Sequence, residues 1–382
     1  MASSTRTLLS KCRTLLRQNV DNVRGSRRNY HEGTGLHRRN FNTHNKTDGG
    51  VQIGILGAPI QSGQRNHGVQ FGPEAIRKAG LIEHLDHHVG MTIKDFGDVE
   101  AGYVQGHADF YLTGKTPLRN PTSTAQANSK VADTVENILK SCDVCLTLGG
   151  DHSTAIGTIT GHARARENIS VLWVDAHPDL NTPVSSPSGN IHGMPLHFLM
   201  HDLQNERLSI PEFEWVKPCI TSSNLGYIAI RDIDPGEIAI MKRYNIPHCS
   251  IREIDRNGIA HCMEKILDMI NPSGNRPIHL SFDIDSLDPS IAPATGTRVR
   301  GGLTYREGMY ICEEVARTGC LSAMDLVEVN PELSNFREAK RTSEVAVEII
   351  KHALGLSDTY KLERHPQQTR LKCELVFSDA QP

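Results

Sequence analysis

Short apolar runs that alternate with amphipathic stretches constrain the fold of this chain more than any other feature. Strands are expected at 51–56, 91–95, 144–148, 170–174, 225–230, 278–282 and 321–327. Helical spacing of apolar residues fills stretches between them, at 73–87, 130–141, 258–270, 304–318 and 343–354. Short, continuously apolar strands separated by helices are typical of a parallel sheet covered on both faces. We therefore expect an α/β fold with three layers, helix–sheet–helix, around a mostly parallel sheet.

Two polar stretches rich in Pro, Ser, Thr and Asn interrupt this pattern, at residues 104–129 and 181–224. Both are expected as long loops, and loops of that length in a compact domain are usually functional or mobile. Since no repeat and no linker divides the rest, we expect one domain over residues 49–355. For the tail, 356–382, contact with a neighbouring subunit and a frayed end both stay open.

The first 46 residues differ in charge from the rest of the chain. They contain ten Lys or Arg and two acids, a net +8, whereas the whole chain carries −3. Apolar residues in this segment lie on one face of a helix: Leu8, Leu9, Cys12, Leu15 and Leu16. An amphipathic, Arg-rich start is typical of a mitochondrial transit peptide. We expect residues 1–48 to be such a leader and the mature protein to lie in the mitochondrial matrix, with a disordered basic tail as the alternative.

Composition argues against several classes of protein. No apolar run approaches the ~18 residues of a transmembrane helix, so no membrane partner is expected. Residues 47–382 carry a net −11, because the whole chain carries −3 and residues 1–46 carry +8, and this disfavours nucleic-acid binding. Nucleic-acid binding by the basic leader alone stays an alternative. The nine cysteines are odd in number, and their one close pair, Cys142 and Cys145, lies in an apolar run, which disfavours a disulfide framework.

Histidines and carboxylates, the types of residue that bind divalent metal ions, follow four of the expected strands. They are His152, then Asp175, His177 and Asp179, then Asp283 and Asp285, and finally the carboxylate Glu328. The ends of parallel strands meet at one edge of a sheet, where open α/β folds bind ligands. The first six offer four carboxylates and two imidazoles, and such carboxylates repel one another unless cations neutralise them. Oxygen-rich ligation without sulfur favours Mn²⁺, with Zn²⁺, Co²⁺ or Fe²⁺ compatible, so we expect two Mn²⁺ per subunit.

At these residues the sequence resembles the arginase and agmatinase family of ureohydrolases. The matching motifs are Gly149-Gly-Asp-His152-Ser153, Asp175-Ala-His177-Pro-Asp179 and the stretch from Ser281 to Ala294. The resemblance runs from residue 51 to residue 355 and implies an arginase/deacetylase-like αβα fold. It implies two metal ions with these ligands: His152, Asp175, Asp179 and Asp283 for one, and Asp175, His177, Asp283 and Asp285 for the other. Asp175 and Asp283 would therefore bridge the two ions.

The resemblance also implies the reaction. A hydroxide shared by the two metal ions would attack the guanidinium carbon of L-arginine, giving urea and L-ornithine. Glu328 would anchor the guanidinium, and His192 would act as a proton shuttle or general acid. Six polar residues would bind the rest of the substrate: Asn181, Ser188 and Asn190 at the α-carboxylate, Asp234 and Glu237 at the α-ammonium, and Thr297.

Other interpretations stay open beside this one. They are an agmatinase or another guanidino-acid ureohydrolase, and a catalytically silent oligomeric binding protein. The segment 304–308 resembles one that joins subunits, which implies a homo-oligomer, a trimer by resemblance. The chain departs from the family pattern at positions that remove no expected ligand: Pro178, Met194, Ser286, Arg298 and Arg300.

Overall fold

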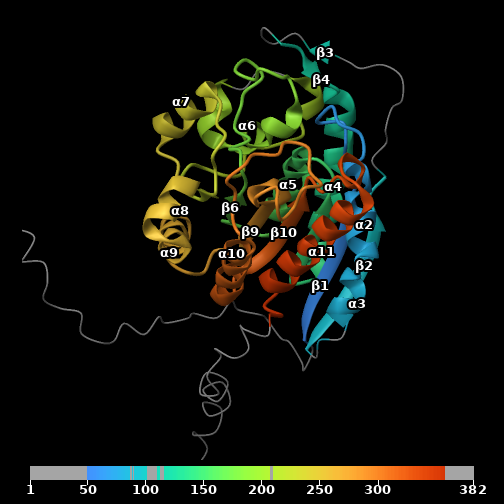
Figure 1. Cartoon of the computed structure of the whole chain (residues 1–382). Coiled ribbons are helices and arrows are strands. Elements are labelled where there is room, and N and C mark those ends of the chain that lie inside the picture. Colours follow the sequence, from blue (N-terminus) through green and yellow to red (C-terminus); the bar gives the residue numbers. More distant parts are fainter. Residues whose placement is uncertain are drawn as a thin grey trace, which may run out of the picture. The chain divides into compact units, whose positions relative to one another are not determined.

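Eight parallel strands form the central sheet of the computed structural model, which describes residues 50–86, 88, 90–100, 110–111, 116–206 and 210–357 (Figure 1). Their order is β2-β1-β5-β10-β9-β6-β7-β8, and every described pairing between neighbours is parallel. The bounds are β1 Val51–Ala58, β2 Met91–Asp98, β5 Val144–Gly149, β6 Ser170–Val174, β7 Leu225–Ile228, β8 His248–Cys249, β9 Ile278–Asp283 and β10 Leu321–Val327. The predicted α/β fold with a parallel sheet is confirmed. A separate antiparallel pair joins β3 (Phe110–Tyr111) to β4 (Leu118–Arg119).

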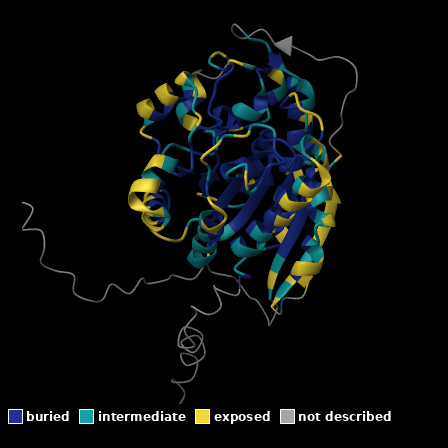
Figure 2. Ribbon diagram, in the orientation of Figure 1, coloured by how far each residue is buried: buried dark blue, intermediate teal, exposed yellow. Residues whose placement is uncertain are grey.

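Helices cover both faces of this sheet. One face carries α2 (Gly72–Lys78), α3 (Leu81–Asp86), α8 (Ile251–Asn257), α9 (Ile259–Ile270), α10 (Tyr305–Thr318) and α11 (Phe336–Ala353). The other carries α4 (Pro121–Ser141), α5 (Ala155–Ala165), α6 (Pro195–Leu199) and α7 (Pro235–Tyr244). The central strands are buried between these layers (Figure 2).

Alternate residues of the central strands pack into the two helical layers. In β6, Leu172 and Val174 join the core beneath α9 to α11, whereas Val171 and Trp173 join the core beneath α5 and α6. All five residues of β6 are buried. Burial on both faces explains why these strands are continuously apolar in sequence.

Glycines let α5 lie close to α4. A Cβ on Gly157 would lie 2.6 Å from the Asn128 carbonyl oxygen, so only glycine fits there without a shift. The Gly157 amide also donates a 2.8 Å hydrogen bond to Asn128 Oδ1. This packing fixes the start of α5, which follows directly on the turn that contains His152.

The structure corrects several predicted boundaries. The helix predicted at 73–87 is two helices, because Gly80 between them has a φ of +93°. The helix predicted at 130–141 begins at Pro121, inside the predicted loop 104–129, and proline is well accepted at a first helical position. The predicted loop 181–224 contains α6 and three short 3₁₀ turns. The helix predicted from residue 343 begins at Phe336.

Two predicted segments fall almost wholly outside the described residues. The predicted leader, 1–48, lies outside them, as does the predicted tail apart from Leu356 and Ser357. Within the described ranges, no helix is long and apolar enough to span a bilayer.

Candidate metal centre and substrate cleft

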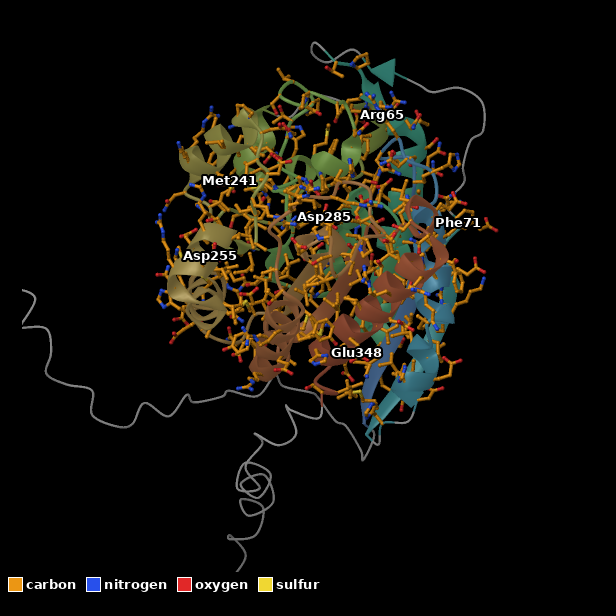
Figure 3. All side chains as sticks on the ribbon, in the orientation of Figure 1. Arg65, Phe71, Met241, Asp255, Asp285 and Glu348 are labelled. Atoms are coloured by element: carbon orange, nitrogen blue, oxygen red, sulfur yellow. The ribbon has the colours of Figure 1, made fainter. Side chains whose placement is uncertain are left out.

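Four neighbouring strands bring the candidate site residues together. β5, β10, β9 and β6 are consecutive in the sheet, although their order along the chain is different. His152 follows β5, Glu328 follows β10, and Asp175 follows β6, while Asp283 is the last residue of β9. Figure 3 shows Asp285, two residues further on, near the middle of the described part. The carboxyl edge of the sheet therefore forms the site, as the sequence predicts.

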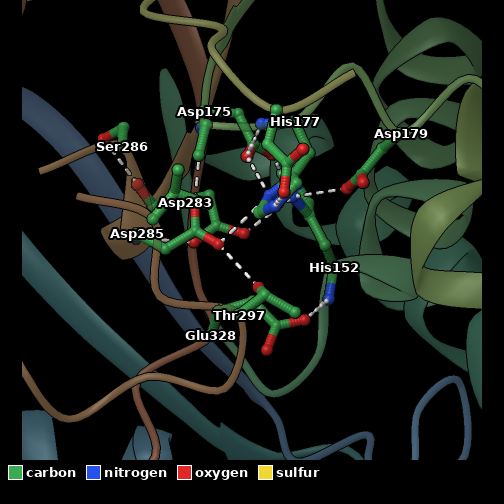
Figure 4. Close-up of polar contacts among 12 residues, drawn as sticks. His152, Asp175, His177, Asp179, Asp283, Asp285, Ser286, Thr297 and Glu328 are labelled. Atoms are coloured by element: carbon green, nitrogen blue, oxygen red, sulfur yellow. Dashed lines mark hydrogen bonds and ion pairs between the residues drawn. The ribbon is translucent and has the colours of Figure 1, made fainter. Parts of the chain in front are cut away.

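His152 lies at the centre of a first group of carboxylates (Figure 4). Its Nδ1 is 3.0 Å from Asp175 Oδ2, 3.1 Å from Asp179 Oδ2 and 3.2 Å from Asp283 Oδ2. This buried nitrogen nevertheless has no well-formed hydrogen bond among the described residues. A buried ring nitrogen that faces three carboxylates without a hydrogen bond fits a metal ligand, because buried polar atoms otherwise find partners.

His177 forms a second group with Asp175 and Asp285. Its Nδ1 lies 3.4 Å from Asp175 Oδ1 and 3.3 Å from Asp285 Oδ2. Asp175 therefore turns one oxygen toward each group, as a bridging ligand would. For Asp283 the bridge stays a prediction, because its Oδ1 accepts a 2.8 Å hydrogen bond from the Asp285 amide.

Burial and crowding raise the pKa of three of these carboxylates, Asp179, Asp283 and Asp285. Burial and the neighbouring charges of Asp285 and Asp175 raise the pKa of Asp283 well above its usual range. Burial and Asp175 raise the pKa of Asp179 to about 6. Crowded carboxylates of this kind are stabilised by cations, so the donor set fits bound metal ions.

Further hydrogen bonds from neighbouring side chains orient the carboxylates of Asp175 and Asp285. Trp173 Nε1 donates to Asp175 Oδ2 at 3.0 Å, and the Trp173 ring stacks on that of His152 with 4.1 Å between centroids. Thr297 Oγ1 donates to Asp285 Oδ2 at 2.7 Å. Thr297, predicted as a substrate residue, thus also touches a candidate metal ligand, and it lines the cleft as well.

His192 and Glu328 form a close pair beside the first group. His192 Nδ1 lies 2.9 Å from Glu328 Oε1, and the same oxygen accepts a 2.9 Å hydrogen bond from the His152 amide. Burial opposes the charged form of His192, but the hydrogen bond and charge of Glu328 raise its pKa to about 9. His192 is therefore mainly protonated at neutral pH.

A cleft of about 140 Å³ opens onto these groups. Its lining includes most of the predicted site residues that are not fully buried: His177, Asp179, Asn181, Ser188, His192, Asp234, Glu237, Asp283 and Thr297. Asn190, predicted to meet the α-carboxylate, does not belong to this lining. Among the lining residues that we did not predict is Asp232, whose Oδ2 lies 3.9 Å from His177 Nε2. Asp232 lies two residues before the predicted Asp234, and this position in the sequence could have indicated that it lines the cleft.

Asp234 and Glu237 also hold the start of α7. Glu237 Oε2 accepts a 2.9 Å hydrogen bond from the Asp234 amide in a reciprocal capping box. Glu237 Oε1 accepts one from the Leu180 amide, also at 2.9 Å, and Asn181 Nδ2 donates to Asp234 Oδ2 at 2.8 Å. Burial raises the pKa of Glu237 to about 8. These carboxylates therefore join the cleft wall to the helix.

The fold and the site define a class of α/β protein with a carboxylate–histidine metal centre at the carboxyl edge of a parallel sheet. Comparison with known proteins then gives the family: the chain belongs to the arginase family, whose family model matches residues 51–355. It is therefore a hydrolase, and the resemblance seen in the motifs is confirmed.

Individual relatives agree with this assignment. The chain is 50% identical to the human (Homo sapiens) protein "Arginase-2, mitochondrial" over 304 residues, which cover 79% of this chain and 84% of the relative. The Bacillus caldovelox arginase structure matches with a TM-score of 0.71 and 37% identity, over 80% of this chain and 98% of that one. The Entamoeba histolytica arginase in complex with L-ornithine matches with a TM-score of 0.70 and 29% identity, over 80% and 99%.

Proposed function

We propose that this protein hydrolyses L-arginine to L-ornithine and urea, with two Mn²⁺ ions bound at the described centre. One observation supports this most strongly: two histidine–carboxylate groups share Asp175 beside a polar cleft. The names of the relatives agree with this reaction, and the Entamoeba histolytica arginase binds L-ornithine, the expected product.

The proposed metal ligands follow from the two groups. His152, Asp175, Asp179 and Asp283 would hold one ion, and Asp175, His177, Asp283 and Asp285 would hold the other. Ligation by oxygen and imidazole without sulfur favours Mn²⁺. When bound, such cations lower the pKa of water and so supply the nucleophile.

Glu328 and His192 would act on the substrate itself. A carboxylate pairs with a guanidinium through two hydrogen bonds, so Glu328 would orient the guanidinium carbon toward the metal centre. His192 is protonated at neutral pH, and it would donate its proton to the leaving amine as the carbon–nitrogen bond breaks. The proton moves from the ring to ornithine, and urea is left.

The outer cleft would recognise the amino-acid end of the substrate. Asn181, Ser188 and Asn190 would receive the α-carboxylate, while Asp234 and Glu237 would meet the α-ammonium. Agmatine lacks the carboxylate and would leave these polar groups without partners. Unpaired polar groups at a binding site disfavour a substrate strongly.

A substrate panel tests this proposal. Urea release is measured from arginine, agmatine, homoarginine and guanidinobutyrate, with metal analysis of the same sample. We expect the highest kcat/KM with arginine and about two Mn²⁺ per chain. Urea from agmatine or guanidinobutyrate but not from arginine would indicate another ureohydrolase. No urea from any of them would indicate a silent binding protein.

We also propose that residues 1–48 form a leader that is removed on import into the mitochondrial matrix. The net charge of +8 over residues 1–46 supports this, as do the relatives named mitochondrial from Homo sapiens and Bos taurus. N-terminal sequencing of the mature protein tests the proposal. A mature protein that keeps residues 1–46 would contradict it and would favour a role for the basic segment itself.

We propose that the mature protein is a homotrimer, with the tail, 356–382, as a subunit contact. The resemblance of segment 304–308 to one that joins subunits supports this. Light scattering of the chain with and without the tail tests the proposal, and a monomeric full-length chain would contradict it.

A further inference from the structure

Arg65 lies beside the cleft, on the segment that follows β1, and its side chain is exposed (Figure 3). Its Nη2 donates a 3.2 Å hydrogen bond to the carbonyl oxygen of Ser188. Ser188 lines the cleft, and it is one of the residues proposed to receive the α-carboxylate of the substrate. The positive charge of Arg65 therefore lies next to the place where the proposed substrate carries a negative charge.

The backbone that carries Arg65 is fixed on both sides. The side chain of Gln64, which is 6% exposed, binds the next peptide groups: its Nε2 donates to the Asn66 carbonyl and its Oε1 accepts from the Asn66 amide, both at 2.5 Å. Before it in the chain, the Gly63 carbonyl accepts a 3.0 Å hydrogen bond from the His192 amide. The Arg65 side chain therefore extends from a backbone whose position relative to the site is set.

The loop that carries Ser188 is also held by other contacts. The carbonyl oxygen of the preceding residue, Pro187, accepts a 3.2 Å hydrogen bond from Thr116 Oγ1. The carbonyl oxygen of the following residue, Gly189, accepts a 3.0 Å hydrogen bond from the Arg119 amide. These two contacts hold the loop on both sides of Ser188 whether or not the guanidinium contact is present. The shape of the loop therefore does not explain why a charged side chain lies there.

Most of the hydrogen-bonding capacity of Arg65 is unused. A guanidinium has five N–H donors in a planar fork, and the contact with Ser188 uses one of them. Arg65 forms no ion pair with any residue that the structure describes. A guanidinium in this state can pair with a carboxylate through two parallel hydrogen bonds.

The charges of the cleft explain why a carboxylate would need such a partner. None of the described residues that line the cleft is Lys or Arg, and the His192 ring is paired with Glu328. Five lining residues are acids: Asp179, Asp232, Asp234, Glu237 and Asp283. Such a lining attracts the guanidinium and ammonium groups of a substrate but repels its carboxylate. A cation next to Ser188 offsets this repulsion at the end of the cleft where the carboxylate would bind.

We propose that Arg65 is a specificity-determining residue whose guanidinium pairs with the α-carboxylate of the substrate and so favours arginine over agmatine. This inference rests on the proposed function, because the position of the α-carboxylate belongs to it. The α-carboxylate takes no part in the bond changes at the guanidinium carbon. The contact is therefore the same before and during the reaction, so it lowers KM and leaves kcat unchanged.

Arg65→Gln tests the inference with two competitive inhibitors, L-ornithine and 1,4-diaminobutane, which differ only in the α-carboxylate. We expect the KM of arginine and the Ki of L-ornithine to rise by about 3- to 10-fold, as for the loss of a partly exposed ion pair. We expect kcat and the Ki of 1,4-diaminobutane to stay unchanged. Calorimetric titration of the Mn²⁺-loaded chain with L-ornithine should show the same loss of affinity without turnover.

Salt and a conservative variant separate the charge of Arg65 from a role in loop structure. The difference between wild type and Arg65→Gln should shrink from about 0.1 M to about 1 M salt, because the Debye length falls from ~10 Å to ~3 Å. Arg65→Lys keeps the charge and should keep most of the affinity for L-ornithine. A loss in Arg65→Gln that is independent of salt, or an equal rise in the Ki of 1,4-diaminobutane, would overturn the inference.

Arg164→Gln is the matched control. It removes the same charge at the end of α5 that lies away from His152, where Arg164 pairs with Asp133 at 2.9 Å. We expect wild-type KM and Ki values in this variant, and a shift equal to that of Arg65→Gln would overturn the inference. An unchanged Ki of L-ornithine in Arg65→Gln would overturn the inference alone. A wild-type chain that neither releases urea from arginine nor binds L-ornithine would overturn the proposed function, and this inference with it.

Discussion

Asp179 and Glu328 occupy a backbone region that residues other than glycine rarely adopt. Their φ values are +48° and +64°, and both belong to the candidate site. Such a conformation costs about 1–3 kcal/mol and persists where the surroundings impose it. The side chain of Glu328 is held in the site by the hydrogen bond that it accepts from the His152 amide and by its contact with His192.

Glu328→Gln tests whether Glu328 anchors the guanidinium of the substrate. The amide of glutamine has the shape of the Glu328 carboxylate but carries no charge. It would therefore form no ion pair with a guanidinium and would not stabilise the charged ring of His192. We expect kcat/KM for arginine to fall by about 100-fold or more, with Mn²⁺ content unchanged. An NMR titration should show the pKa of His192 lower than in the wild type. Wild-type kcat/KM would exclude Glu328 as the anchor.

The pKa of His192 also predicts a pH dependence of stability in the metal-free chain. Its folded value of about 9 lies above the unfolded value of ~6.5. The His192–Glu328 pair therefore contributes stability that is fully present below pH ~6.5 and is lost as the pH rises through about 9. We expect His192→Gln to lower the free energy of unfolding by about 2–3 kcal/mol at pH 6 and by much less at pH 10. Denaturant unfolding at both pH values measures this, and an equal loss at both would contradict it.

The residues that the structure brings together at the candidate metal centre could mostly be predicted from residue type and spacing. Asp283 and Asp285 follow a buried strand, and side chains of this kind at a strand end meet at one edge of the sheet. The detailed grouping could not be predicted from alternation. Alternation in an extended chain would place Asp175, His177 and Asp179 on one face, but the turn at Asp179 brings its carboxylate to His152, away from the second group.

At the scale of elements, close packing of α5 on α4 holds the turn that contains His152. The sequence of α5 did not predict a helix, because Gly157, Gly161 and two threonines disfavour one in isolation. Burial against α4 stabilises it in the fold. Local propensity cannot show this, since the contact joins segments distant in sequence.

Gly157→Ala measures that contact. The added methyl group would press on the Asn128 carbonyl, which belongs to the backbone and cannot move freely. We expect a loss of about 1–3 kcal/mol in the free energy of unfolding, as for other overpacked cores. Gly308→Ala in α10 is the control, because its new methyl group meets the flexible end of Leu287. Equal effects of the two substitutions would contradict the account.

At the scale of the whole molecule, the order of the strands brings the site together. The segments that carry His152, Asp175, Asp283 and Glu328 occur in that order in the chain, but the sheet arranges their strands as β5-β10-β9-β6. The alternation of strands and helices predicts a parallel sheet, but not which strands are neighbours. That order depends on packing between distant segments, so it required the structure.

The net charge of the whole chain, −3, is the sum of two unlike segments. It combines +8 over residues 1–46 with −11 over residues 47–382, and four of those negative charges are the buried carboxylates of the candidate metal centre. Cations that bind the folded chain should stabilise it by mass action. We expect Tm to fall when a chelator removes the metal and to rise with Mn²⁺ concentration on reloading. A Tm that is independent of Mn²⁺ would contradict metal binding at this centre.

We propose that a pair of Mn²⁺ ions, held in part by Asp285, carries out the hydrolysis of L-arginine. Urea release from L-arginine by the Mn²⁺-loaded chain and by Asp285→Ala tests it most directly. Asp288→Asn serves as the control, because Asp288 lies on the same segment and binds the loop amides of Ser290, Gly301 and Gly302. We predict urea release by the wild type and the control, and a loss of about 100-fold or more in Asp285→Ala. Unchanged turnover in Asp285→Ala would contradict a role for the pair of Mn²⁺ ions in urea release.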